Sequence, residues 1–240
     1  MNAVRKYRTP ALAVAACAAL VVMPAASDDS APAYAPHFTR AATPSKAPNA
    51  DGFLQRWLLL EPIRIQIRSN QELVDSFVQT NLKKEYFPNQ FTLIPRDGDK
   101  VTVGGVELTW HALDATSYNV NLFHFATALN KPAYNAIYWA VTTVNCPYEM
   151  RNVQLSVGSN SASIWWVNGT EVIDLYGDRH MLVDDGVSKR LTLQKGQNIV
   201  RVAVVNAPGL SNMCARFLDA HDKPLRGFTL SLASAGKPRS

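Results

Sequence analysis

Alternation of apolar and polar residues, with a period of two, dominates this chain from residue 100 onward. Such alternation is typical of strands that are buried on one face, and about ten short runs of it follow one another. Two of the separators between runs, Gly104-Gly105 and Asn168-Gly169, are signals for tight hairpins. Helical patterns do not alternate with these runs, which argues against a parallel α/β sheet. The chain is therefore expected to form an all-β, antiparallel β-sandwich of the jelly-roll type.

One short helix is expected near the N-terminal end of this domain. Ser69-Asn70-Gln71-Glu72 has the form of a capping box. The apolar residues between 73 and 82 then recur at helical spacing, and Pro88 ends the pattern. The strands that we expect cover residues 53–60, 101–103, 106–110, 119–125, 136–144, 153–157, 162–167, 171–175, 190–193, 198–205, 213–218 and 227–232.

The N-terminus has the organisation of a secretory signal peptide over residues 1–27. Residues 1–8 are basic and residues 9–26 are almost wholly apolar, with small residues at the end. Cleavage there predicts an exported protein, periplasmic or extracellular, without a membrane span in its mature form. One alternative is an uncleaved anchor, although the run is short for a span of about 20 residues. The other is a lipoprotein acylated at Cys17, within Val14-Ala15-Ala16-Cys17.

Composition then divides the rest of the chain. Residues 28–51 contain four prolines and seven alanines without a hydrophobic period, which predicts a flexible linker. The sandwich is expected at residues 52–232, and a flexible tail at 233–240. The net charge is +5, but loss of the three basic residues of the signal leaves +2. A nearly neutral domain does not indicate a nucleic-acid partner.

Two cysteines remain after the signal peptide, Cys146 and Cys214. Exported proteins meet an oxidising compartment, so a disulfide bond between them is expected. The alternative is that both are small buried apolar residues. Neither has the spacing of a metal site or of a redox-active CxxC motif.

Six segments, in order, resemble a known family. They are GFLQRWLLLEP, VTVGGVELTWHAL, AIYWAVTTV, VQLSVGSNSASIWWVNGTEV, LTLQKGQNIVRVAVVN and NMCARFLDAHDKPLRGFTL. Together they resemble galactose-binding-like, jelly-roll β-sandwich modules associated with secreted bacterial carbohydrate-active hydrolases and esterases. The resemblance implies glycan binding only by analogy. The reason is that proteins of one fold carry out many different functions. The chain departs from the family pattern at Asn160-Ser161, where the pattern has two aspartates, and at Gln197, where it has tryptophan.

The chain contains no recognisable catalytic motif. A nucleophile elbow, a zinc-binding HExxH, a phosphate-binding loop and a dinucleotide fingerprint are all absent from the sequence. The leading hypothesis is a non-catalytic interaction module that binds a glycan or supports a carbohydrate-active system. One alternative is a polysaccharide-acting hydrolase, such as an acetyl esterase, whose site is dispersed over several strands. A further alternative is an envelope scaffold with a protein partner.

A ligand-binding cluster is expected at Trp166, Tyr176, Arg179 and His180. If Trp165 faces the core, alternation places Trp166 on the opposite face of its sheet. Tyrosine, arginine and histidine on the following loop would then surround an aromatic platform suited to a sugar. The alternative is that Trp166 is covered by the loop at 176–189.

The same loop is rich in acids. Asp174, Asp178, Asp184 and Asp185 are expected to be solvated loop residues. The alternative is a structural calcium ion held by these carboxylates. No other cofactor is expected.

Overall fold

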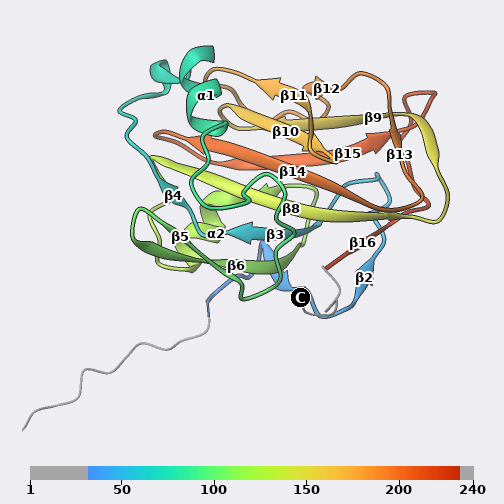
Figure 1. The fold of residues 1–240 in the computed structure, drawn as a ribbon, viewed down its shortest axis with the longest axis horizontal. Coiled ribbons are helices and arrows are strands. Elements are labelled where there is room, and N and C mark those ends of the chain that lie inside the picture. The colour runs from blue at the N-terminus through green and yellow to red at the C-terminus, as the bar shows by residue number, and fades with distance from the viewer. Residues whose placement is uncertain (1–31, 233–240) are drawn as a thin grey trace, which may run out of the picture. The chain divides into compact units, whose positions relative to one another are not determined.

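Two antiparallel sheets stack on one another in the computed structural model, which describes residues 32–232 (Figure 1). This arrangement confirms the predicted all-β sandwich. The large sheet has eleven strands: β1 (Phe38–Arg40), β2 (Ser45–Lys46), β3 (Arg56–Leu60), β4 (Ile63–Arg64), β5 (Lys100–Val103), β6 (Val106–Ala115), β8 (Ala136–Cys146), β10 (Ser163–Val167), β11 (Thr170–Leu175), β14 (Gly196–Asn206) and β16 (Thr229–Ser231). The small sheet has five: β7 (Val120–Asn121), β9 (Met150–Ser159), β12 (Gly186–Val187), β13 (Leu191–Leu193) and β15 (Asn212–Leu218).

Both predicted hairpins form. Gly104 and Gly105 join β5 to β6, and Asn168 and Gly169 join β10 to β11. All four residues have positive φ angles between 52° and 83°. Two successive residues with positive φ define the two-residue turn whose twist matches that of paired strands, which is why glycine and asparagine are needed there.

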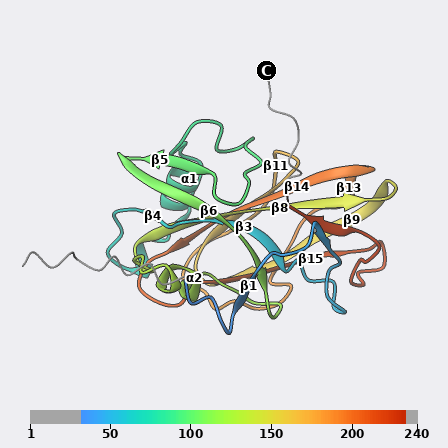
Figure 2. The same ribbon diagram turned by 90° about the horizontal axis from the view of Figure 1, so that it is seen from below.

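The large sheet is apolar on both faces. Along β8, Tyr138 and Ala140 face the small sheet, whereas Trp139 and Val141 point the other way, and all are buried. The inner core lies between the two sheets. The outer core lies between the large sheet and residues 65–99, which we call the insertion (Figure 2). The central strands β3, β8, β10 and β14 therefore need cover on two sides.

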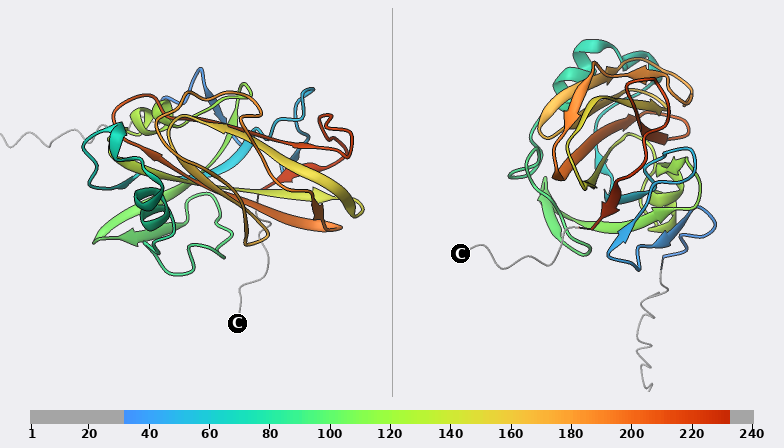
Figure 3. Two further views of the ribbon diagram at one scale, coloured as in Figure 1. Left: turned by 90° about the horizontal axis from the view of Figure 1, so that it is seen from above. Right: turned by 90° about the vertical axis from the view of Figure 1, so that its right-hand side faces the viewer.

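The insertion contains a 3₁₀ turn, η1 (Asn70–Glu72), and one helix, α1 (Asp75–Leu82). The helix lies against β10 and β14 (Figure 3). Its predicted start is corrected, because Val74 rather than Ser69 is the N-cap residue. The Glu72 carboxylate accepts a hydrogen bond from the Arg68 backbone N–H, so the expected capping box does not form.

A second helix replaces most of a predicted strand. Residues 119–125 were expected to be extended, but the chain forms only β7 before α2 (Leu122–Ala128). The Asn121 side chain accepts a hydrogen bond from the His124 backbone N–H at 2.8 Å and so caps this helix. Leu122, Phe125 and Ala126 then place an apolar stripe at helical spacing into the inner core.

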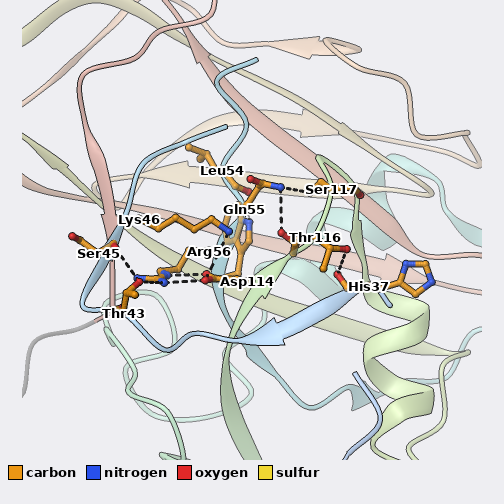
Figure 4. Close-up of polar contacts among 12 residues, drawn as sticks. His37, Thr43, Ser45, Lys46, Leu54, Gln55, Arg56, Asp114, Thr116 and Ser117 are labelled. Atoms are coloured by element: carbon orange, nitrogen blue, oxygen red, sulfur yellow. Dashed lines mark hydrogen bonds and ion pairs between the residues drawn. The ribbon is translucent and has the colours of Figure 1, made fainter. Parts of the chain in front are cut away.

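The linker expected over residues 28–51 is also corrected, because the chain belongs to the sandwich from residue 32. β1 pairs with β6, and β2 pairs with β16. Arg56, which is 1% exposed, holds this segment: it donates to both carboxylate oxygens of Asp114 and to the carbonyl and hydroxyl of Thr43, at 2.6–2.9 Å (Figure 4). A buried bidentate pair with its remaining donors satisfied fixes backbone position.

Several predictions concern residues outside the described range. The signal peptide at 1–27, the lipid site at Cys17 and the tail at 233–240 lie there. Within residues 32–232, no helix has the length and apolar character needed to cross a bilayer.

One buried arginine attaches the insertion to the large sheet. Arg201, in β14, is 3% exposed and donates to the carbonyl oxygens of Phe91 and Leu93, both at 2.5 Å. It forms no ion pair with any carboxylate of residues 32–232. Burial lowers the pKa of Arg201 to about 10. The guanidinium therefore donates two hydrogen bonds to backbone carbonyl oxygens, which would otherwise lack hydrogen-bond donors.

Replacing Arg201 with methionine should loosen the insertion, because two carbonyl oxygens lose a charged donor. We expect a loss of about 2–3 kcal/mol in the free energy of unfolding and faster proteolytic cleavage within residues 84–99. Denaturant unfolding and limited proteolysis measure the two effects. Arg151→Met is the matched control, since Arg151 is exposed and, within residues 32–232, its ion pair is with Glu149 alone. Equal behaviour of the two variants would contradict this role for Arg201.

Candidate functional site

The two adjacent tryptophans of β10 face opposite sides of the large sheet, as alternation predicted. Trp165 lies in the inner core, where its indole N–H donates to the Ser163 hydroxyl at 2.9 Å. Trp166 lies in the outer core. It stacks on Trp139 with ring centroids 5.6 Å apart, and the edge of Phe91 meets it at 5.8 Å.

These contacts correct the expectation that Trp166 is an open platform. Its side chain is 6% exposed and packs beneath Phe91 of the insertion. The cover therefore comes from a segment 75 residues earlier in the chain, not chiefly from the loop at 176–189 that the alternative named. An indole in this position acts as core packing.

The other three predicted residues lie on the loop after β11. The Tyr176 side chain is half-buried, and its hydroxyl contacts the Gln79 carboxamide and the Asp174 carboxylate. Arg179 is half-buried and donates through Nε to Asp185 at 3.0 Å. His180 is exposed. That Tyr176, Arg179 and His180 bind a ligand stays a prediction.

A cavity of about 470 Å³, which we call the first cavity, lies where this loop meets the insertion. Tyr176 is the member of the predicted cluster that lines it. The two walls are joined by a hydrogen bond from the Gly177 N–H to the Leu73 carbonyl at 3.0 Å. The lining residues are Asn70, Gln71, Leu73, Val74, Asp75, Tyr176, Gly177 and Asp178.

Sequence reasoning missed the polar residues of the opposite wall. Asn70 and Gln71 were assigned to a capping box at the start of a helix, and Asp75 lies within the predicted helical pattern. The signal available was the excess of polar residues between Ser69 and Asp75, but their position beside Tyr176 depends on a contact across about one hundred residues, which local patterns do not report.

The Tyr176 hydroxyl is held in its neutral form. Partial burial, followed by the hydrogen bond to Asp174, raises the pKa of Tyr176 above its ordinary value of 10.0. The first cavity therefore has both hydrogen-bond donors and acceptors: a neutral phenol, two carboxamides, and the carboxylates of Asp75 and Asp178. The two carboxylates make its electrostatic potential negative.

The disulfide bond expected between Cys146 and Cys214 does not form, because the two side chains lie on different sides of the small sheet. Cys146 faces the inner core, with its Sγ 3.7 Å from Nδ2 of Asn198. Cys214 alternates with Met213 and Ala215, which face the inner core, and so points outward under Leu182 and Gly158. Burial raises the pKa of Cys146 and raises that of Cys214 to about 12. Both are unreactive buried thiols.

The four loop acids that suggested calcium do not gather into a ligand set. Asp184 pairs with Arg216, and Asp185 pairs with Arg179. Asp174 accepts hydrogen bonds from Tyr176 and Gln79. Across residues 32–232, no group of three or more histidine, cysteine, aspartate or glutamate side chains is placed to hold a metal ion.

A buried polar network lies at the edge of the inner core. The Tyr34 hydroxyl is 3.0 Å from Nδ1 of His111, whose Nε2 is 3.5 Å from Oε1 of Glu61. Oε2 of Glu61 is 3.0 Å from Nζ of Lys131. Burial raises the pKa of Tyr34 to about 12. Burial alone would raise the pKa of Glu61, but His111 and Lys131 lower it below 4.5. The network joins the segment before β1 to β6 and to the end of α2.

Comparisons with known proteins give no family for this chain. No family model matches it, and no curated protein matches it. Among solved structures, the PA14 domain of the antifreeze protein MpAFP is 10% identical with a TM-score of 0.41, over 83% of this chain and 100% of that one. The PA14 sugar-binding domain from an RTX adhesin is 13% identical with a TM-score of 0.38, over 74% and 99%.

A subtype-switched epithelial adhesin A domain from Candida glabrata, in complex with β-lactose, is 9% identical with a TM-score of 0.37, over 83% and 97%. Likeness at this level supports no inference about the function of this chain.

Replacing Trp166 with alanine should destabilise the protein by about 3–5 kcal/mol, because it removes a buried indole from a close-packed cluster. Thermal and denaturant unfolding measure this loss. Tyr148→Ala is the control, since Tyr148 is 61% exposed. A Trp166→Ala protein as stable as wild type would show that the indole is not packed as described.

Replacing Glu61 with glutamine should produce a pH-dependent loss of stability. A carboxylate with a lowered pKa stabilises the fold above its ordinary value of 4.5, and this contribution disappears as pH falls through the lowered pKa. We therefore expect Glu61→Gln to lower the melting temperature at pH 7, and the difference from wild type to shrink as the pH falls below 4.5. Glu107→Gln, in an exposed pair with Lys100, is the control. A difference that is constant from pH 3 to pH 7 would argue against the charged network.

Proposed function

We propose that this sandwich is a non-catalytic module that binds a glycan in the first cavity. The observation that carries the proposal is the lining itself: one tyrosine ring, two carboxamides and two carboxylates around a cavity of about 470 Å³. Binding sites for small ligands combine apolar or aromatic surface with a few placed polar groups. Sugars match this pattern, because their C–H faces pack on aromatic rings and their hydroxyls both donate and accept hydrogen bonds.

Preorganisation of Tyr176 supports the proposal. Its hydroxyl is held from two elements, by Gln79 of α1 and by Asp174 of β11. The walls of the cavity are also joined through Gly177 and Leu73. A ring that is already ordered loses little conformational entropy when a ligand binds.

Charge indicates which glycans suit this cavity. Asp75 and Asp178 line it, and Asp174 lies behind Tyr176. Carboxylates accept hydrogen bonds from neutral hydroxyls but repel an acidic sugar. We therefore propose a neutral glycan as the ligand of the first cavity.

The wider role follows from the N-terminus and the motifs. Export through the signal at residues 1–27, support of a carbohydrate-active system in the periplasm or outside the cell, and the galactose-binding-like affiliation are parts of this proposal. The hydrolase alternative required a serine and a histidine within hydrogen-bond reach. Within residues 32–232, no serine hydroxyl is hydrogen-bonded to a histidine ring.

Replacing Tyr176 with alanine should weaken binding of a neutral glycan by about 1–3 kcal/mol, because it removes the only aromatic ring among the residues that line the first cavity. A glycan array with the purified chain identifies the ligand, and titration calorimetry measures the affinities. Tyr176→Phe keeps the ring and should retain most of the affinity. Absence of binding to any neutral polysaccharide, or equal affinity in the alanine variant, would overturn the assignment.

The same experiment distinguishes glycan binding from the alternative function of an envelope scaffold. A scaffold would bind no glycan, and would instead retain the same protein from envelope extracts whether or not Tyr176 is replaced. A hydrolase would release acetate from a generic aryl acetate.

A further inference from the structure

A second cavity of about 560 Å³ is lined by residues of the insertion that come just before those of the first cavity. Residues 66–68 line the second cavity, and residues 70, 71 and 73–75 line the first. The remaining walls of the second cavity are Tyr134 and Asn135, before β8, and Pro208 and Gly209, after β14.

The three walls are fixed to one another by backbone and side-chain hydrogen bonds. The Ile65 N–H donates to the Asn135 carbonyl at 2.9 Å. The buried Asn206 carboxamide donates to the Ala133 carbonyl at 2.7 Å and to the Gly209 carbonyl at 3.4 Å. These bonds join the segment after β4, the segment before β8 and the segment after β14. The walls of the second cavity are therefore held in place by the fold itself.

One arginine that lines the second cavity, and a second arginine beside its Tyr134 wall, have no acidic partner among the described residues. Arg68 lines it and is exposed. Arg64 is exposed, and its Nη1 lies 3.4 Å from the carbonyl of Tyr134. Neither guanidinium forms an ion pair with any carboxylate of residues 32–232, and the Glu72 carboxylate accepts only from the Arg68 backbone N–H.

An exposed aromatic ring completes the lining. Tyr134 is 47% exposed, and its ring packs edge-on against Phe123 of α2 at 5.4 Å. This contact orients the ring. Gln66 and Asn135 add carboxamides that both donate and accept hydrogen bonds.

We propose that the second cavity binds a carboxylate-bearing sugar unit, such as a uronic acid residue. The planar guanidinium fork matches a carboxylate with two parallel hydrogen bonds. Tyr134 supplies a face for the sugar ring, and the two carboxamides supply partners for its hydroxyls. The positive second cavity and the negative first cavity thus select different sugars.

This inference extends the proposed function but does not depend on it, because the two cavities share no lining residue. Failure of one leaves the other testable. Variants of Tyr176 should change neutral-glycan binding alone, and variants of Arg68 should change uronate binding alone.

The test uses oligogalacturonate and its methyl ester as a matched pair of ligands, titrated into the full chain. The ester keeps the sugar and removes the charge. We expect oligogalacturonate to bind the wild type, and both the ester and the Arg68→Gln variant to lose roughly tenfold or more in affinity, as expected when a charged hydrogen bond is removed. Tyr134→Ala should weaken binding as well. Unchanged melting temperatures show that the variants remain folded.

Arg151→Gln is the control for net charge, since Arg151 is exposed on β9, outside the lining of the second cavity. Several outcomes would overturn the proposal. They are absence of oligogalacturonate binding to the wild type, equal binding of the ester, an equal loss in Arg151→Gln and Arg68→Gln, or tighter binding of a sulfated oligosaccharide of the same length.

Discussion

The large sheet must be covered on both faces, and the rest of the structure depends on this requirement. In β8 and β10 nearly every side chain is buried, whichever face it points to. Leaving either face in water would expose a large contiguous apolar surface, which soluble domains rarely tolerate. The small sheet and α2 cover one face, and the insertion covers the other. The insertion is thus a structural part of the domain rather than an appendage.

Covering both faces brings polar groups into buried positions, and three of them attach one segment to another. Arg56 holds the segment before β3, and Arg201 holds the insertion. Asn198, which is fully buried, bonds to both the N–H and the carbonyl of Gln194 and also to the Asn168 carboxamide, so it links two hairpin turns. Most buried polar groups in proteins are hydrogen-bonded, and Arg56, Arg201 and Asn198 each donate to a backbone carbonyl.

The first and second cavities both lie along the border of the insertion. Each of the two is lined on one side by residues of the insertion and on the other by loops at the ends of strands. The first cavity forms against the loop after β11, and the second against the loops that flank β8 and β14. Residues on such loops carry polar side chains without being needed for the core, which leaves them free to bind ligands.

The sequence alone determined the features that act between near neighbours. Alternation determined the strands, glycine and asparagine determined the two hairpins, and a period of two placed Trp165 and Trp166 on opposite faces. Short apolar runs are compatible with both a strand and a helix, so the sequence pattern did not predict α2. The tertiary structure shows the helix and its cap at Asn121.

Only the tertiary structure decided which segments meet. Arg201 reaches Phe91 across 110 residues, and Tyr34 reaches His111 across 77. Such contacts determine that Trp166 is covered, that Cys146 and Cys214 lie apart and that Asn70 and Tyr176 line one cavity. They arise from burial of apolar area between distant segments, which has no periodic signature in the chain.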